Sequence, residues 1–409
     1  MSTKTFAHRL SPSSVSPALA LLLSMALLGP ALAGDREQAK RIHDRLVGTP
    51  PSTACLDQLQ NKLTTVSAGA AAMDAITDDG AGDNCVGQEF YRVTLKNFVT
   101  PWTNEEQTVF APLNDYTATV IGIVRDNHDF RRILWDDILY TGPAPSNLTT
   151  SNAHYQALED SGADLQAVLT ETTQTAAMSL PVGAAAGVMT TRAAAKAFFV
   201  DGTNRAMFRF TLLNHLCNDL EQLKDTSYTP DRIRQDVSRS PGGDSRIYMN
   251  ACIGCHNGMD PLTQAFAYYN YEYPVDGNGD PDYDAGHMVY TADTVQGKYL
   301  INANNFEYGY ITPNDNWDNY WRAGSNSALG WDSALTGSGS GASSMGKELA
   351  HSEAFARCQV EKVFKAVCLR APVDATDRSQ IDAMTTTFKS STYKLKQVFA
   401  DSAVYCKGS

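Results

Sequence analysis

Cys252-Ile253-Gly254-Cys255-His256 is a C-x-x-C-H pentapeptide, and this spacing occurs once in the chain. It is the attachment signature of a c-type haem. Two thiols one helical turn apart can each add to one of the two vinyl groups of the porphyrin. The imidazole that follows the second thiol can then supply an axial nitrogen to the iron. The motif predicts one covalent haem bound through Cys252 and Cys255, with His256 as an iron ligand.

Two other chemistries also use closely spaced cysteines, namely half of a zinc site and a dithiol redox pair. A zinc site would need two further ligands in a second pair, and the chain has no other paired Cys/His spacing. A thioredoxin-like dithiol would follow a strand in a βαβ pattern, which the surrounding sequence does not show. The haem interpretation is therefore favoured, and the zinc and dithiol sites stay as its alternatives.

The second axial ligand of the iron is predicted to be Met345. This residue precedes an expected helix and follows the Gly/Ser-rich run 337–344, which we expect to be a loop with the backbone freedom that a ligand loop needs. Met288, His287 and His351 compete with it for the same role. A methionine beside a helix is ordinarily core filler, so a packing role for Met345 is also open.

The other ring nitrogen of His256 needs an acceptor that fixes the tautomer and the orientation of the imidazole. A backbone carbonyl near Asp260-Pro261 is well placed in the sequence to accept that proton. Pro261 also suits the first turn of a following helix. We therefore expect a main-chain acceptor for His256.

Residues 1–33 have the pattern of a signal peptide. Lys4 and Arg9 supply a short positive region, residues 17–28 are apolar, and Ala31-Leu32-Ala33 is a small-x-small cleavage site. The apolar run is too short to span a bilayer, and no later run is long enough. We expect the mature protein to be periplasmic or secreted, without a membrane span.

The chain has 409 residues and a formal net charge of −12 at pH 7. This charge argues against binding to nucleic acid or to an anionic lipid surface. It suits a basic redox partner protein, although many exported proteins are acidic for solubility alone. The oligomeric state is not determined by the sequence.

Six cysteines are left after the two in the motif, and an even remainder in an oxidising compartment fits up to three disulfides. Buried free thiols are the alternative, and six cysteines allow fifteen pairings. The pairs that we predict are Cys55–Cys85, Cys217–Cys358 and Cys368–Cys406.

The periodicity of apolar residues predicts a mainly α fold. We expect a helical N-terminal domain over 34–180 and a c-type haem domain over 181–409. The segment 268–341 is rich in Tyr, Trp, Asn and Gly, and it predicts a long irregular insertion. The longer helices are expected at about 104–125, 152–178, 184–199, 345–369 (with a break) and 377–406.

Three stretches carry a likeness to a known family: Gly187-Val188-Met189-Thr190 with Gly202-Thr203-Asn204-Arg205, Cys252 to His256 with Met259-Asp260-Pro261-Leu262, and Glu348-Leu349-Ala350. Together they resemble the secreted planctomycete-type cytochrome c proteins, which are haem-bearing chains built largely from domains of unknown function. The sequence departs from that family after Lys365, where Ala366-Val367-Cys368-Leu369-Arg370 replaces its usual Tyr-Ala-Leu-Gly-Arg run. The resemblance implies a haem-binding exported protein, and it transfers no reaction.

These observations favour an exported monohaem c-type cytochrome that carries electrons in the periplasm or outside the cell. A haem enzyme of the peroxidase or oxidase kind is the first alternative, and a non-catalytic haem-bearing surface or sensor protein is the second. Electron transfer favours an iron that keeps two axial ligands, whereas peroxide or oxygen chemistry needs an open position. A haem can be held by about a hundred residues, so the size of this chain leaves room for a further role.

Overall fold

The computed structural model describes residues 33–77, 84–85, 87–283 and 285–408. The predicted signal peptide, residues 1–33, therefore lies outside the described residues except for Ala33. None of the helices in these ranges combines the length and the apolar composition that crossing a membrane requires.

Helices form most of the structure, so the prediction of a mainly α fold is confirmed. The longer helices are α2 (Asp35–Val47), α3 (Thr53–Thr65), α6 (Asp115–Arg125), α11 (Arg205–Leu216), α13 (Ile253–Thr263), α14 (Gly341–Ala350), α15 (Glu353–Cys368), α16 (Ala375–Ser390) and α17 (Leu395–Tyr405). Shorter segments include α4 (Ala68–Asp74), η1 (Phe90–Leu95), α5 (Lys96–Val99), η3 (Phe130–Leu134), α7 (Ala153–Asp160), α8 (Leu165–Val168), α9 (Gln174–Ala177), α10 (Arg192–Phe198), α12 (Ser245–Ile247), η5 (Tyr248–Cys252) and η9 (Tyr320–Arg322).

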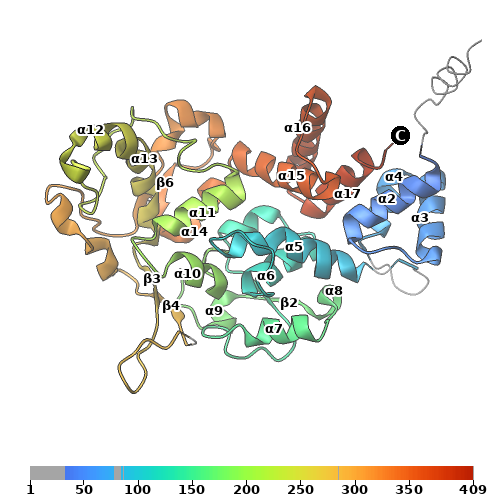
Figure 1. The fold of residues 1–409 in the computed structure, drawn as a ribbon, viewed down its shortest axis with the longest axis horizontal. Coiled ribbons are helices and arrows are strands. Elements are labelled where there is room, and N and C mark those ends of the chain that lie inside the picture. The colour runs from blue at the N-terminus through green and yellow to red at the C-terminus, as the bar shows by residue number, and fades with distance from the viewer. Residues whose placement is uncertain (1–32, 78–83, 86, 284, 409) are drawn as a thin grey trace, which may run out of the picture.

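The strands of the described residues are short and form three separate two-stranded antiparallel sheets. The pairs are β1 (Leu139–Thr141) with β2 (Thr170–Thr172), β3 (Tyr269–Glu272) with β4 (His287–Tyr290), and β5 (Asn316–Asp318) with β6 (Ser338–Ser340). Figure 1 shows an elongated arrangement, with α2–α4 at one end, α12 and α13 at the other, and α5, α6 and α10 between them.

Three of the predicted helices are shorter than the sequence indicates, and the first two are those over 104–125 and 152–178. The segment 104–125 is helical only over α6, because Asn114 ends the preceding loop by accepting a hydrogen bond from the N–H of Thr117. The segment 152–178 is divided into α7, α8, β2 and α9. Gly162 adopts a left-handed conformation (φ 62°) after α7, and the residues of β2 pair with β1 instead of continuing a helix.

In two further stretches the secondary structure differs from the one that the local sequence predicts, because each stretch packs against or pairs with a distant part of the chain. The segment 184–199 is helical only over α10. Before it, Gly187 has φ 54°, and a Cβ there would lie 2.0 Å from the carbonyl oxygen of Ile133, so the chain runs tightly against η3. The Gly/Ser run 337–344, expected as a loop, instead forms β6 and the first turn of α14. The helices predicted over 345–369 and 377–406 are present as α14–α15 and α16–α17.

One hydrophobic cluster extends from Ala39 in α2 to Ala403 in α17. It draws residues from both predicted domains, 34–180 and 181–409, and the boundary between them stays a prediction. Helix α6 is buried at every position from Asp115 to Val124, because it is surrounded by other elements of this cluster. Helices at both ends of the molecule, such as α2 and α13, therefore contribute side chains to one hydrophobic core.

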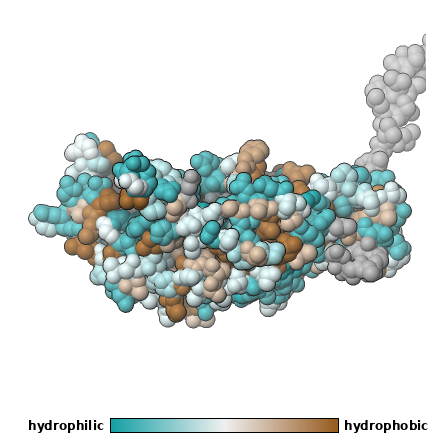
Figure 2. Space-filling model, turned by 90° about the horizontal axis from the view of Figure 1, so that it is seen from below, coloured by the Kyte–Doolittle hydropathy of each residue, from teal (hydrophilic) through white to brown (hydrophobic). Residues whose placement is uncertain are grey.

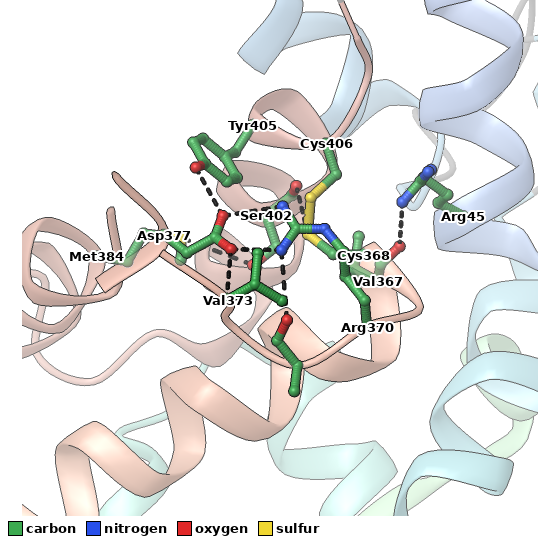
Figure 3. The surroundings of a disulfide bond; sticks show 11 residues. Arg45, Val367, Cys368, Arg370, Val373, Asp377, Met384, Ser402, Tyr405 and Cys406 are labelled. Atoms are coloured by element: carbon green, nitrogen blue, oxygen red, sulfur yellow. Dashed lines mark hydrogen bonds and ion pairs between the residues drawn. A yellow bond between two sulfur atoms is a disulfide. The ribbon is translucent and has the colours of Figure 1, made fainter. Parts of the chain in front are cut away.

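All three predicted disulfides are present: Cys55–Cys85, Cys217–Cys358 and Cys368–Cys406. Figure 3 shows the last of them, which joins the end of α15 to the residue after α17. Beside it, Arg45 of α2 donates to the carbonyl oxygen of Val367 at 3.1 Å. These contacts hold the N-terminal and C-terminal helices together.

The irregular segment 268–341 covers one side of α13. Trp321 of η9 is buried and lies against Gly258, where a Cβ would be 1.9 Å from its Nε1. Trp331 donates its Nε1–H to the carbonyl oxygen of Trp321 at 2.9 Å. The glycine of α13 is therefore needed for the close approach of an aromatic ring.

Candidate haem-attachment site

The C-x-x-C-H motif lies on one helical segment built from α12, η5 and α13. Asp244 begins it by accepting a hydrogen bond from the N–H of Arg246 at 2.9 Å. The turn η5 is a π-helix, a widened turn that is frequent at functional sites. Cys252 ends this turn and Cys255 follows in α13, so both thiols are carried by continuous helical backbone.

Cys252 and Cys255 are free thiols and are partly exposed. Cys252 packs against a small apolar cluster that includes Ile233 and Val237. The sulfur of Cys255 lies 3.6 Å from the carbonyl oxygen of Leu220, and burial raises the pKa of the Cys255 thiol. Redox-active C-x-x-C pairs have a lowered thiol pKa instead. The six other cysteines are in disulfides, so none of them is free to complete a zinc site.

The imidazole of His256 is held by a carboxylate. Its Nδ1 lies 3.2 Å from Oδ1 and 3.3 Å from Oδ2 of Asp260, one helical turn further along α13. The expected main-chain acceptor near Asp260-Pro261 is therefore wrong. Helix α13 continues through Pro261, and the carbonyl of Asp260 accepts from the hydroxyl of Thr263. Among the described residues Nε2 of His256 has no hydrogen-bond partner, so it is free to face an iron.

Asp260 is fully buried and is held by two arginines. Arg205, the first residue of α11, donates through Nε to Oδ1 at 2.7 Å and through Nη2 to Oδ2 at 2.9 Å. The backbone N–H of Arg234 lies 3.4 Å from Oδ2. Burial alone would raise the pKa of Asp260, but Arg205, His256 and Arg234 outweigh it and hold that pKa well below its ordinary value. The bidentate contact with Arg205, whose guanidinium stays protonated, favours the ionised form of Asp260.

Arg234 is also buried, and two of its nitrogens, Nε and Nη1, have no hydrogen-bond partner among the described residues. Its Nη2 donates to the hydroxyl of Thr203 at 2.8 Å, and its guanidinium lies 4.6 Å from the ring centre of Tyr299. Unpaired buried donors are costly and need an explanation. Nε of Arg234 lies 4.0 Å from Oδ1 of Asp236, so the charge of the buried guanidinium is balanced by that carboxylate and by Asp260.

Apolar side chains beside the motif also fit a porphyrin. Ile247 and Met249, just before the motif, are 47% and 55% exposed. Figure 2 views the molecule from the side opposite α12, and there hydrophobic and polar surface patches are mixed. A large exposed apolar side chain is commonly covered by a ligand or a partner. The donor set of two thiols, a free imidazole nitrogen and an apolar surround therefore suits haem.

The predicted sixth ligand lies in the core. Met345 is fully buried within the main hydrophobic cluster, and its neighbour Gly346 is so close to η3 that a Cβ would lie 1.8 Å from the carbonyl oxygen of Leu134. The competing residues lie elsewhere: Met288 and His287 on β4, and His351 at the end of α14, where its Nδ1 donates to the carbonyl oxygen of Lys347. The ligand role of Met345 stays a prediction.

The sequence interpretation missed the carboxylate of Asp260 and the two arginines behind it. The spacing of four residues from His256 to Asp260 was a usable signal, since such residues share one face of a helix. Arg205 and Arg234 lie 55 and 26 residues before Asp260, and no local pattern connects them to it. Only the packing of α11 and of the loop before α12 against α13 brings them together.

A second cluster of potential metal ligands lies away from the motif. Within the described residues it is the only group of three or more such side chains, and it consists of Asp126, His128 and Glu171, whose ligand atoms lie within 4.8 Å of one another. Arg125 and Arg132 form ion pairs with its two carboxylates. We interpret this cluster as a surface network of ion pairs.

Comparison of the chain with protein-family models, curated proteins and solved structures finds no match. The resemblance to the planctomycete-type cytochrome c proteins is carried by short stretches around residues 187–217, 252–266 and 348–358, and it stays a prediction.

Proposed function

We propose that this protein is an exported monohaem c-type cytochrome that carries electrons in the periplasm or outside the cell. The observation that carries the proposal is the chemical state of the motif. Cys252 and Cys255 are the free cysteines among the described residues, they lie on one helical segment, and His256 next to them has one ring nitrogen fixed and the other free. This is the donor set that covalent haem attachment uses.

The position of the motif supports a carrier role. The thiols and His256 are partly exposed, so a haem attached there would lie close to the surface, where electrons can pass to another protein. The net charge of −12 favours a basic partner, because complementary charge speeds encounter. A redox partner protein is therefore part of the proposal, and the three disulfides are compatible with an oxidising compartment.

A haem enzyme is the second candidate, and one observation favours it. The pair of His256 with the buried carboxylate of Asp260 makes the imidazole a more basic ligand, which helps an iron that activates peroxide or oxygen. The coordination state separates the two candidates, because a carrier keeps both axial ligands and an enzyme has an open position.

The first test concerns the cofactor. The chain, expressed in cells with a haem-attachment system, is expected to carry one haem that survives denaturation and acid–acetone extraction. The double variant Cys252→Ala/Cys255→Ala should lose covalent haem, whereas Cys368→Ala/Cys406→Ala should keep it. An intact mass without haem, or with two haems, contradicts the proposal.

The second test concerns the sixth ligand. A carrier predicts a low-spin, six-coordinate haem, with a near-infrared thioether-to-iron band that Met345→Ala removes. If Met288→Ala removes the band instead, Met288 is the sixth ligand, and the carrier role is unaffected. High-spin spectra with rapid binding of cyanide or carbon monoxide would favour the enzyme.

A further inference from the structure

Asp260 connects His256 to the buried arginines of the site, because its carboxylate contacts both the imidazole and Arg205. Its carboxylate is fully buried, contacts Nδ1 of the imidazole with both oxygens, and is held on its other side by the bidentate guanidinium of Arg205. Arg205 is itself fixed by Asp236, to which it donates at 2.5 and 3.0 Å. The carboxylate is thus oriented by contacts that do not involve the imidazole.

An ionised acceptor acts on an imidazole differently from a main-chain carbonyl. A carboxylate draws the Nδ1 proton toward itself, so more electron density stays on the ring and on Nε2. A more basic axial nitrogen stabilises ferric iron relative to ferrous iron, and hydrogen bonds beyond the ligand are a recognised means of setting a haem potential. Because Asp260 is shielded from water, its effect is not weakened by solvent.

We propose that Asp260 is a positioning residue that holds the Nδ1–H of His256 and sets a low reduction potential for the haem. The inference rests on the proposed haem and deepens it by naming what regulates its redox equilibrium. Arg205 has the supporting role of holding both oxygens of the carboxylate while they contact Nδ1 of the imidazole. The same pair keeps the ring from rotating, so Nε2 stays directed away from Asp260.

The test uses the full haem-loaded protein. Asp260→Asn keeps an oxygen acceptor of similar shape and removes the charge. The ferric/ferrous equilibrium is expected to move at least tenfold toward the ferrous form, which is 59 mV for one electron. The matched control is Asp236→Asn, because Asp236 also binds Arg205 and does not contact His256. Asp260→Glu, which keeps the charge, should restore most of the wild-type potential.

A spectroscopic measurement on the unmutated protein keeps the proposal testable if Asp260→Asn fails to fold. The iron–histidine vibration, recorded after photolysis of the carbon monoxide complex, should have the raised frequency of a strongly hydrogen-bonded imidazole. An ordinary frequency, or equal shifts in Asp260→Asn and Asp236→Asn, would overturn the role of Asp260. A wild-type protein without covalent haem by intact mass would instead refute the proposed function itself.

Discussion

Two regions of the molecule, one around the motif and one at the C-terminal end of the chain, are stabilised by different interactions. The motif end, which comprises α12, η5 and α13 with Arg205 and Arg234, buries charges and leaves Nε and Nη1 of Arg234 without a hydrogen bond among the described residues. The stapled end, which comprises α15–α17, buries mainly apolar side chains and closes on itself through Cys368–Cys406. In the stapled end, buried Asp377 has Arg370 and Tyr405 as partners (Figure 3), whereas Oε1 of buried Gln359 in α15 has no hydrogen-bond partner among the described residues.

This difference indicates that the stapled end serves stability and the motif end serves a binding function. Burying a charge costs free energy unless it is paired, so a fold that only needs stability uses apolar packing and disulfides. The stapled end follows that rule. The motif end does not, because it buries Asp260 against His256 and pairs that carboxylate with Arg205. Such a cluster is expected where a site must control the chemistry of a bound group.

The largest expected effect on stability comes from the disulfide that joins α11, which begins with Arg205, to α15 of the stapled end. Cys217, which follows α11, is bonded to Cys358 of α15 across 141 residues. In the chain-entropy model the double variant Cys217→Ala/Cys358→Ala should lose about 5 kcal/mol of unfolding free energy. Urea unfolding measures this loss. Removal of Cys368–Cys406, which closes 38 residues, should cost about 4 kcal/mol. A larger loss from the shorter loop would contradict the comparison.

Apolar packing is expected to dominate the stapled end. Phe399 of α17 is fully buried and lies 5.1 Å from the ring of Phe90 and 5.3 Å from that of Phe98. Phe399→Ala should destabilise the fold by about 3–5 kcal/mol, because a large cavity forms. The control is Phe110→Ala, since that ring is 91% exposed and its removal should change stability by less than about 0.5 kcal/mol. Thermal or urea unfolding distinguishes the two variants.

Close packing at the motif end has its own test. In Gly258→Ala the new Cβ would meet the buried ring of Trp321, so either α13 or η9 must move. We expect a loss of about 1–3 kcal/mol, as for other overpacked positions. Gly277→Ala is the matched control, because nothing lies within 4 Å of a Cβ there. Equal stability of the two variants would show that α13 is not held by the segment 268–341.

The smallest expected effect is a dependence of stability on pH at the stapled end. Hydrogen bonds from Arg370, the N–H of Val373 and Tyr405 lower the pKa of Asp377 below its ordinary value of 3.8. As the pH falls below about 4, the unfolded chain takes up this proton first, so the contribution of Asp377 is present above that pH and is lost in acid. Asp377→Asn should therefore flatten the pH dependence of the urea midpoint below pH 4.

A carboxyl group on a neighbouring helix should behave in the opposite way. Burial raises the pKa of Asp401 in α17, so its folded form binds the proton more readily than the unfolded chain. Its contribution falls as the pH rises above about 4. Asp401→Asn should steepen the loss of stability in acid. The same slope in both variants would contradict the contacts of Asp377.

Local sequence was sufficient for features that depend on neighbouring residues. The helices α2, α3, α16 and α17 follow from apolar spacing and capping residues, such as Ser52, whose side chain accepts from the N–H of Cys55. The even number of cysteines outside the motif indicated up to three disulfides but not their pairing, and the three pairs that we chose among fifteen are confirmed. The motif itself placed Cys252, Cys255 and His256 on one helical segment, because their spacing is that of a helical turn.

Tertiary structure decided what depends on residues far apart in the chain. The run 337–344 became β6 and the start of α14 because β5 offered it backbone partners, which no local pattern encodes. Met345 was placed in the shared core by the packing of α14 on η3. The partner of His256 is a carboxylate because α13 continues through Pro261 and because Arg205, 55 residues earlier, neutralises Asp260 in the interior. A buried charge needs a nearby opposite charge, and only the folded chain determines which residue supplies it.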